Sequence, residues 1–195
     1  DATEGYVPTD TISGSSCTFK FPGEKKPYSL SGGAGTGTIQ KMTQLSSNCA
    51  FMRLSQVAGV ANVALMATRL GIRSDLYLHD SEGNPTQPPY NLTLGTMGVS
   101  PLDMAAAYSV FANDGLRNEP YMVERIEDRT GKVIYQHQHR PERIISTQTA
   151  RLVNSVLVSN VTGGTGRRAK IDGGQQAAGK TGTTNDSTDV WFVGY

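Results

Sequence analysis

The sequence predicts a mixed α/β domain in which helices alternate with antiparallel strand pairs. Amphipathic stretches with apolar residues spaced by three and four indicate the helices, and short turns between β-prone segments indicate the strand pairs. Glycine and proline are concentrated in three stretches that separate these elements. With 195 residues, the chain is long enough for one domain with a hydrophobic core.

The three Gly- and Pro-rich stretches are expected to be long loops, at residues 1–37, 80–98 and 163–179. In the first, closely spaced glycines and prolines leave no room for an uninterrupted helix. Loops of this length are uncommon in compact domains unless they are functional or wrap a site. We therefore expect a functional site bordered by these loops.

Between the loops the pattern is helical, and several helix ends carry clear signals. Ser100-Pro101 combines a capping serine with proline at the first helical position, and Gly71 and Gly115 stand where helices should end. The triplet Ser46-Ser47-Asn48 interrupts a helical pattern. The expected helices cover 38–45, 49–56, 60–70, 101–111 and 147–161.

Two strand pairs are expected. One joins 122–126 to 132–135 around Thr130-Gly131, and the other joins 180–184 to 190–195 through a turn at 185–188. The final strand is apolar on both faces, so we expect it to be buried between helical layers and to pair with protein beyond the 195 residues. Because the chain starts without Met and ends inside this strand, it is interpreted as a piece of a longer polypeptide.

Charge and composition exclude several classes of function. The 18 Lys and Arg are scattered and balanced by 17 Asp and Glu, so the basic patch of a nucleic-acid or membrane-surface binder is missing. No apolar run approaches the ~18 residues of a membrane span. The three His and two Cys lack zinc-site spacing, and we expect no metal or other cofactor.

The strand beginning at Lys180 has the composition of an edge strand that faces a cleft. Gly182 packs nothing and would let another backbone approach closely, Lys180 supplies a positive charge, and Thr181 and Thr183 supply hydroxyls. A peptide could then bind as an added strand. The alternative is a polar edge protected by its lysine against aggregation.

The Ser46-Ser47-Asn48 triplet also has two readings. Ser and Asn form turns by hydrogen-bonding their own backbone, so Ser47 or Asn48 would simply cap the following helix. The alternative is that the triplet carries chemistry together with the Lys180 strand.

Ser-x-Asn followed far downstream by Lys-Thr-Gly resembles the second and third motifs of penicillin-binding proteins and serine β-lactamases. From Tyr6 to Tyr195 the chain resembles the transpeptidase domain of class A, bifunctional penicillin-binding proteins. The segments that carry the resemblance are Leu45-Ser-Ser-Asn-Cys-Ala-Phe51, Val99-Ser-Pro-Leu-Asp-Met-Ala-Ala-Ala-Tyr108, Phe111-Ala-Asn-Asp-Gly115, Ala178-Gly-Lys-Thr-Gly-Thr-Thr-Asn-Asp186 and Asp189-Val-Trp-Phe-Val-Gly194.

The resemblance implies an antiparallel sheet flanked by helices, here incomplete, with residues 1–195 as the C-terminal portion of the domain. The family's first motif, Ser-x-x-Lys, is not matched, and the nucleophilic serine is expected upstream. Cys17-Thr18-Phe19-Lys20 imitates that motif with a thiol, but Phe21-Pro22-Gly23 would break the long helix that the nucleophile should open.

The resemblance also implies roles for the two retained motifs. The upstream serine would attack the bond between the terminal D-alanines of a peptidoglycan stem peptide, and a neighbouring amine would take the acyl group. Ser46 would relay protons and Asn48 would hold the substrate amide. Lys180, with the hydroxyls of Thr181 and Thr183, would favour the substrate carboxylate, and the Thr183 N–H would be one oxyanion donor.

By the same resemblance, the expected partners are stem peptides ending in D-Ala-D-Ala, β-lactams, and the rest of the same protein: an upstream transpeptidase segment, a glycosyltransferase domain and a membrane anchor. The expected location is the extracytoplasmic face of a bacterial membrane, where the protein would contribute to cell-wall synthesis and cell shape. Alternatives are a β-lactamase or D,D-carboxypeptidase on the same fold, or an inactive sensor that binds β-lactam or peptide. An intact or lost upstream Ser-x-x-Lys separates enzyme from sensor.

The two cysteines leave two possibilities open. A domain outside the cytoplasm could pair Cys17 with Cys49, which would need Cα atoms within about 7 Å. Cys49 could instead be a small buried apolar side chain.

Overall fold

The computed structural model describes residues 5–184 and 187–195. The α-helices are α1 (Ile39–Gln44), α2 (Asn48–Ala58), α3 (Val60–Leu70), α4 (Pro101–Ala112) and α5 (Thr147–Gly163), with 3-10 turns η1 (Leu92–Leu94), η2 (Arg167–Ala169) and η3 (Asp172–Gly174). The strands are β1 (Thr11–Phe19), β2 (Tyr28–Thr38), β3 (Leu116–Arg117), β4 (Arg125–Glu127), β5 (Val133–Gln136), β6 (Glu142–Arg143), β7 (Gly179–Thr183) and β8 (Val190–Gly194).

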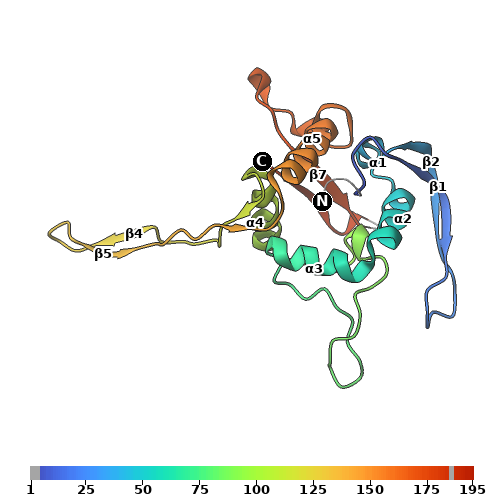
Figure 1. The fold of residues 1–195 in the computed structure, drawn as a ribbon, viewed down its shortest axis with the longest axis horizontal. Helices are drawn as coiled ribbons and strands as arrows, with labels where there is room; N and C mark the ends of the chain where they lie inside the picture. Colours follow the sequence, from blue (N-terminus) through green and yellow to red (C-terminus); the bar gives the residue numbers. More distant parts are fainter. Residues whose placement is uncertain (1–4, 185–186) are drawn as a thin grey trace.

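The fold is mixed α/β, as predicted. In the described residues the strands form four separate antiparallel pairs, β1–β2, β3–β6, β4–β5 and β7–β8. Helix α5 contacts β7 and helix α4 contacts β8, and β7 lies near the centre of the view in Figure 1. The β7–β8 hairpin thus has helices on one side, which fits the expected antiparallel sheet flanked by helices.

The predicted helix ends are confirmed by their capping contacts. The side chains of Thr38, Ser47 and Ser100 each accept a hydrogen bond from a backbone N–H in the first turn of α1, α2 and α4. Helix α3 ends at Gly71, whose φ of 117° suits a residue without a Cβ. These local signals therefore determine where the helices around the site begin and end.

The first predicted loop is wrong over most of its length. Residues 1–37 contain β1 and most of β2, a long hairpin whose turn includes Pro22-Gly23. The ladder tolerates glycines because strand backbones approach closely there: a Cβ on Gly32 would lie 2.3 Å from the Gly14 carbonyl oxygen. The other two loops are largely irregular, with η1 in the second and η2 and η3 in the third.

Two links join the β1–β2 hairpin to α2. Arg53 donates hydrogen bonds to the carbonyl oxygens of Ser13, Ser15 and Ser16, at 2.7, 3.0 and 3.2 Å. These carbonyls lie where the strand register shifts, so the guanidinium satisfies acceptors that the irregular ladder leaves open. The second link is a disulfide between Cys17 and Cys49, with Cα atoms 5.7 Å apart.

The core lies between α3 and α4 and under α5. One cluster joins α3 and α4 through small and aliphatic side chains, and further buried side chains lie under α1, α2 and α5. The α3–α4 cluster consists of Ala64, Ile72, Leu76, Leu92 and Ala107. The large side chains that are almost fully buried elsewhere are Met42, Met52, Val110 and Val161.

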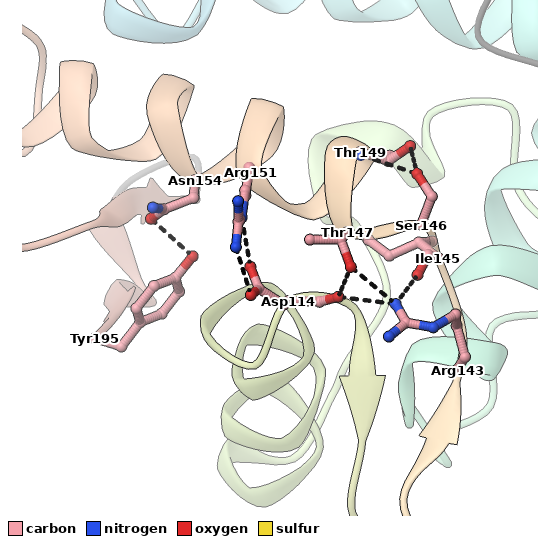
Figure 2. A network of polar contacts seen from close by, with 9 residues as sticks. All are labelled: Asp114, Arg143, Ile145, Ser146, Thr147, Thr149, Arg151, Asn154 and Tyr195. Atoms are coloured by element: carbon pink, nitrogen blue, oxygen red, sulfur yellow. Dashed lines mark hydrogen bonds and ion pairs between the residues drawn. The ribbon is translucent and has the colours of Figure 1, made fainter.

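A polar network fixes the start of α5 against the end of α4 (Figure 2). Asp114 makes a two-pronged ion pair with Arg151, 3.0 Å at each contact, and its backbone carbonyl accepts from Arg143 at 3.0 Å. At the other side of α5 the Tyr195 hydroxyl donates to Asn154 at 3.2 Å, and burial raises the pKa of Tyr195 to about 12. The helix beside β7 is thus held at both α4 and the end of the chain.

The β4–β5 hairpin forms as predicted, with a shorter first strand, and projects away from the body of the molecule (Figure 1).

The final hairpin also forms, although the expected turn residues 185 and 186 lie outside the described residues. One of the two faces of β8 that we expect to be buried in the larger protein is exposed in the chain described: Val190 and Phe192 are 71% and 44% exposed. Helices cover the opposite face alone, where Trp191 and Val193 are half-buried.

No single helix within the described ranges is long and apolar enough to cross a membrane. The pair α2 and α3 reaches the necessary length together but is bent by 94°.

Candidate active site

Ser46 lies in the tight turn between α1 and α2. Its backbone adopts φ 53°, a left-handed conformation that is unusual for a residue with a Cβ. Ser47 follows as the N-cap of α2, so the capping reading of the triplet is correct for Ser47. The cap leaves the Ser46 hydroxyl free to face β7, and its side chain is exposed.

One edge of β7 is paired with β8 and the other faces away from it. Ala178 and Tyr195 exchange backbone hydrogen bonds, and Thr184 donates to Asp189, so alternate residues of β7 bond to β8. By this alternation, the N–H and C=O groups of Gly179, Thr181 and Thr183 point to the opposite edge. An added strand, or a peptide, would bind at that edge.

The Lys180 side chain of β7 contacts Ser46 in the turn between α1 and α2. The Lys180 ammonium donates to the Ser46 hydroxyl at 2.8 Å and to the Thr181 carbonyl at 2.9 Å. Burial lowers the pKa of Lys180 because it penalises the charged form. Residues 134 positions apart in the sequence are therefore joined by a direct hydrogen bond.

The other predicted site residues lie on the same two elements. Asn48 is the first residue of α2, and its exposed side chain makes no hydrogen bond to another residue that the structure describes. Thr183 is exposed at the end of β7. A Cβ on Gly182 would meet Trp191 at 3.7 Å, an ordinary contact, so nothing in the described chain requires glycine there.

Two residues that contact β7 were not predicted from the sequence as part of the site. Asn160 of α5 is fully buried and donates from Nδ2 to the Gly179 carbonyl at 2.8 Å. Thr165 accepts a hydrogen bond from the Thr181 hydroxyl at 2.7 Å. The available signal was the position of Asn160, three residues after Leu157 on the apolar stripe of α5, where an amide must find partners.

Cys17 is not a nucleophile at a helix start. It lies within β1, is 7% exposed and is disulfide-bonded to Cys49. No helix starts at this position, in agreement with the helix break expected at Phe21-Pro22-Gly23. Of the two possibilities left open by the sequence, the structure has the disulfide, and Cys49 is buried as well.

Residues 5–195 match the sequence profile of the penicillin binding protein transpeptidase domain. The chain belongs to this family. Penicillin-binding protein 1A of Clostridium acetobutylicum is 33% identical over 199 residues, covering 99% of this chain and 24% of that protein. The corresponding protein of Pseudomonas aeruginosa is 32% identical, covering 77% of this chain and 23% of its own length. The chain thus spans about a quarter of these class A penicillin-binding proteins.

Solved transpeptidase domains have the same fold. The crystal structure of penicillin-binding protein 1A from Haemophilus influenzae aligns with a TM-score of 0.84 and 26% identity, covering 98% of this chain and 33% of that chain. PonA1 from Mycobacterium tuberculosis, solved in complex with penicillin V, aligns with a TM-score of 0.81 over 98% of this chain and 53% of that chain. At 24% identity, the second comparison concerns the fold alone.

In chemical terms, this transpeptidase-family site presents a hydroxyl bonded to a partly buried ammonium beside an open strand edge. A hydroxyl–ammonium pair can pass a proton, and an ammonium with neighbouring hydroxyls attracts a carboxylate. The open edge supplies backbone groups in extended geometry, which suits a peptide.

Proposed function

We propose that residues 1–195 are the C-terminal portion of the transpeptidase domain of a class A penicillin-binding protein, and that the domain is a serine-type D,D-transpeptidase. A serine of an upstream Ser-x-x-Lys attacks the D-Ala-D-Ala bond of a peptidoglycan stem peptide and forms an acyl-enzyme. The amine of a neighbouring stem then takes the acyl group. β-Lactams acylate the same serine.

The observation that supports this proposal most strongly is the 2.8 Å hydrogen bond between Lys180 and Ser46 at the open edge of β7. In the proposed mechanism Ser46 relays a proton to the departing amine, which requires a partner within hydrogen-bond reach. Asn48 holds the substrate amide from the start of α2.

The substrate carboxylate binds near Lys180, with the hydroxyls of Thr181 and Thr183 as polar partners. The Thr183 N–H, which points to the open edge, is one oxyanion donor, and the N–H of the nucleophilic serine is the other. Gly182 lets the peptide backbone approach. This arrangement uses both retained motifs and requires no metal or cofactor.

The proposal places the protein at the extracytoplasmic face of a bacterial membrane, joined to a glycosyltransferase domain and a membrane anchor. Two observations support this location. The relatives are class A penicillin-binding proteins, and the chain contains a disulfide, a bond typical of oxidising compartments.

Intact mass spectrometry of the parent protein after incubation with a penicillin tests the proposal. The expected result is one penicilloyl adduct per protein, mapped by proteolysis to a serine upstream of residue 1. Incubation with a D-Ala-D-Ala peptide and an amine acceptor should then yield the amide in addition to D-alanine. Release of D-alanine with water as sole acceptor would favour a carboxypeptidase, and no adduct would favour the inactive sensor.

A further inference from the structure

A buried amide holds the strand that carries Lys180 at its unpaired edge. Asn160 is 0% exposed, and its Nδ2 donates to the carbonyl of Gly179 at 2.8 Å. Gly179 immediately precedes Lys180, and its carbonyl lies on the edge of β7 that β8 leaves unpaired. Asn160 therefore occupies the place that a neighbouring strand would otherwise take at this residue.

The orientation of the Asn160 amide fixes the direction of a longer hydrogen-bond chain. A carbonyl can only accept, so the NH₂ group of Asn160 must face Gly179 and its Oδ1 must face Thr165. Thr165 donates to that Oδ1 at 3.2 Å, and accepts from the Thr181 hydroxyl at 2.7 Å. The residues on either side of Lys180 along β7 are thus both anchored to the same pair: Gly179 through its backbone carbonyl and Thr181 through its hydroxyl.

The same pair also reaches the segment that carries Ser46. The backbone N–H of Thr165 donates to the carbonyl of Gln44 at 3.1 Å, and the Gln44 side chain donates to the carbonyl of Ser159, next to Asn160, at 3.1 Å. Gln44 is the last residue of α1, two positions before Ser46. Both halves of the Ser46–Lys180 contact are therefore tied to the end of α5.

The glycines after α5 make room for this arrangement. A Cβ on Gly164 would lie 2.4 Å from Asn160 Oδ1 and 2.8 Å from the Cα of Gln44, and a Cβ on Gly166 would lie 2.9 Å from Asn160 Nδ2. Gly164 and Gly166 thus leave space for the Asn160 side chain, and Thr165 between them supplies the hydroxyl that donates to Asn160 Oδ1.

Resting on the proposed function, we propose that Asn160 and Thr165 are positioning residues for acylation: they hold β7 and the end of α1 so that Lys180 meets Ser46. Neither side chain is hydrogen-bonded to the Lys180 ammonium or the Ser46 hydroxyl in the part of the chain that the structure describes. Acting through Lys180, Thr181 and Ser46, they should affect the acylation step more than the initial binding of a β-lactam, since misplacement of a proton relay slows the chemistry.

The test compares Thr165→Val with Thr165→Ser in the parent protein, using stopped-flow kinetics with a fluorescent penicillin. Valine keeps the shape and removes the hydroxyl, and serine keeps the hydroxyl. We expect Thr165→Val to slow acylation by about 10- to 100-fold with little change in the initial binding constant, and Thr165→Ser to restore most of the rate. The matched control is Thr68→Val, whose hydroxyl bonds to the Ala64 carbonyl within α3, outside this network, and which should leave the rate unchanged.

A second variant, Asn160→Asp, keeps the side-chain size but replaces the donor to Gly179 with an oxygen, and is expected to slow acylation at least as much as Thr165→Val. Wild-type rates in Thr165→Val, or equal losses in Thr165→Val and Thr165→Ser that follow their melting temperatures, would overturn the inference while the proposed function stands. A wild-type parent protein that takes no penicillin would contradict the proposed function and this inference together.

Discussion

Ser46 is held in a backbone conformation that costs energy. For a residue with a Cβ the left-handed region costs about 1 to 2 kcal/mol, and here the turn enforces it, with Ser46 N–H donating to Thr43 and Ser47 N–H donating to Met42 at 3.0 and 2.9 Å. Strained residues cluster at functional sites. The strain directs the Ser46 hydroxyl to Lys180, while Ser47 takes the capping role.

Ser46→Gly should separate stability from activity. Glycine relieves left-handed strain of about 1 to 2 kcal/mol but loses about 0.5 to 1 kcal/mol more entropy on folding, so the free energy of unfolding should lie between the wild-type value and about 1.5 kcal/mol above it. Acylation of the parent protein by penicillin should fall by about 10² to 10⁴-fold because the proton relay is lost. Thermal melts and acylation rates check both; unchanged acylation would show that Ser46 has no chemical role.

The pH dependence of acylation should report Lys180. Burial lowers its pKa below the ordinary 10.5, so the charged form is lost at a lower pH than for an exposed lysine. If the ammonium attracts the substrate carboxylate, the acylation rate should decline on the alkaline side with a midpoint below 10.5. In Lys180→Arg acylation should be slower, but its rate should show no alkaline decline because the guanidinium stays charged. The same alkaline decline in both proteins would assign it to another group.

Among the elements, those with local signals were predicted well and those set by pairing were not. The caps at Thr38, Ser47 and Ser100 and the stop at Gly71 depend on neighbouring residues, which the sequence displays. The glycines of the β1–β2 hairpin predict a loop, but they are tolerated because the paired backbones approach closely, and Arg53 satisfies the carbonyls at the irregular register. Both contacts depend on residues distant in the sequence, so one segment does not reveal them. For the same reason Asn160 was missed, since its partner lies 19 residues away.

Removal of the Cys17–Cys49 disulfide tests the link between the β1–β2 hairpin and α2. The cysteines are separated by 32 residues, for which the loss of chain entropy in the unfolded state predicts about 3 to 4 kcal/mol of stabilisation. The double variant Cys17→Ser/Cys49→Ser should melt earlier than wild type. Reducing agent should lower the melting temperature of wild type and leave the variant unchanged; two free thiols in the oxidised native protein would contradict the link.

At the scale of the whole molecule, apolar surface is distributed unevenly. Helices cover one face of the β7–β8 pair, and Val190 and Phe192 leave the other exposed. The β4–β5 hairpin also carries exposed apolar side chains, including Ile134 at 62%. Scattered apolar residues are normal on a surface, but an exposed sheet face beside a free strand edge favours association.

Residues 1–195 expressed alone are therefore expected to self-associate through the exposed face of the β7–β8 pair. Analytical ultracentrifugation should show species larger than a monomer, and Val190→Thr/Phe192→Thr should reduce them, because threonine is β-branched and suits a strand but presents less apolar area. Substitutions of two exposed leucines on α3 and α5, Leu65→Thr and Leu152→Thr, serve as controls. A cooperatively melting wild-type monomer would contradict this expectation.

The most direct test of the proposed active site is the second-order rate constant for acylation of the parent protein by a fluorescent penicillin, compared between wild type and Lys180→Ala. Removing the ammonium that lies 2.8 Å from Ser46 should cut this rate constant by about 10² to 10⁴-fold, with the melting temperature little changed. Equal rate constants in the two folded proteins would contradict the assignment of the Ser46–Lys180 pair as the centre of the active site.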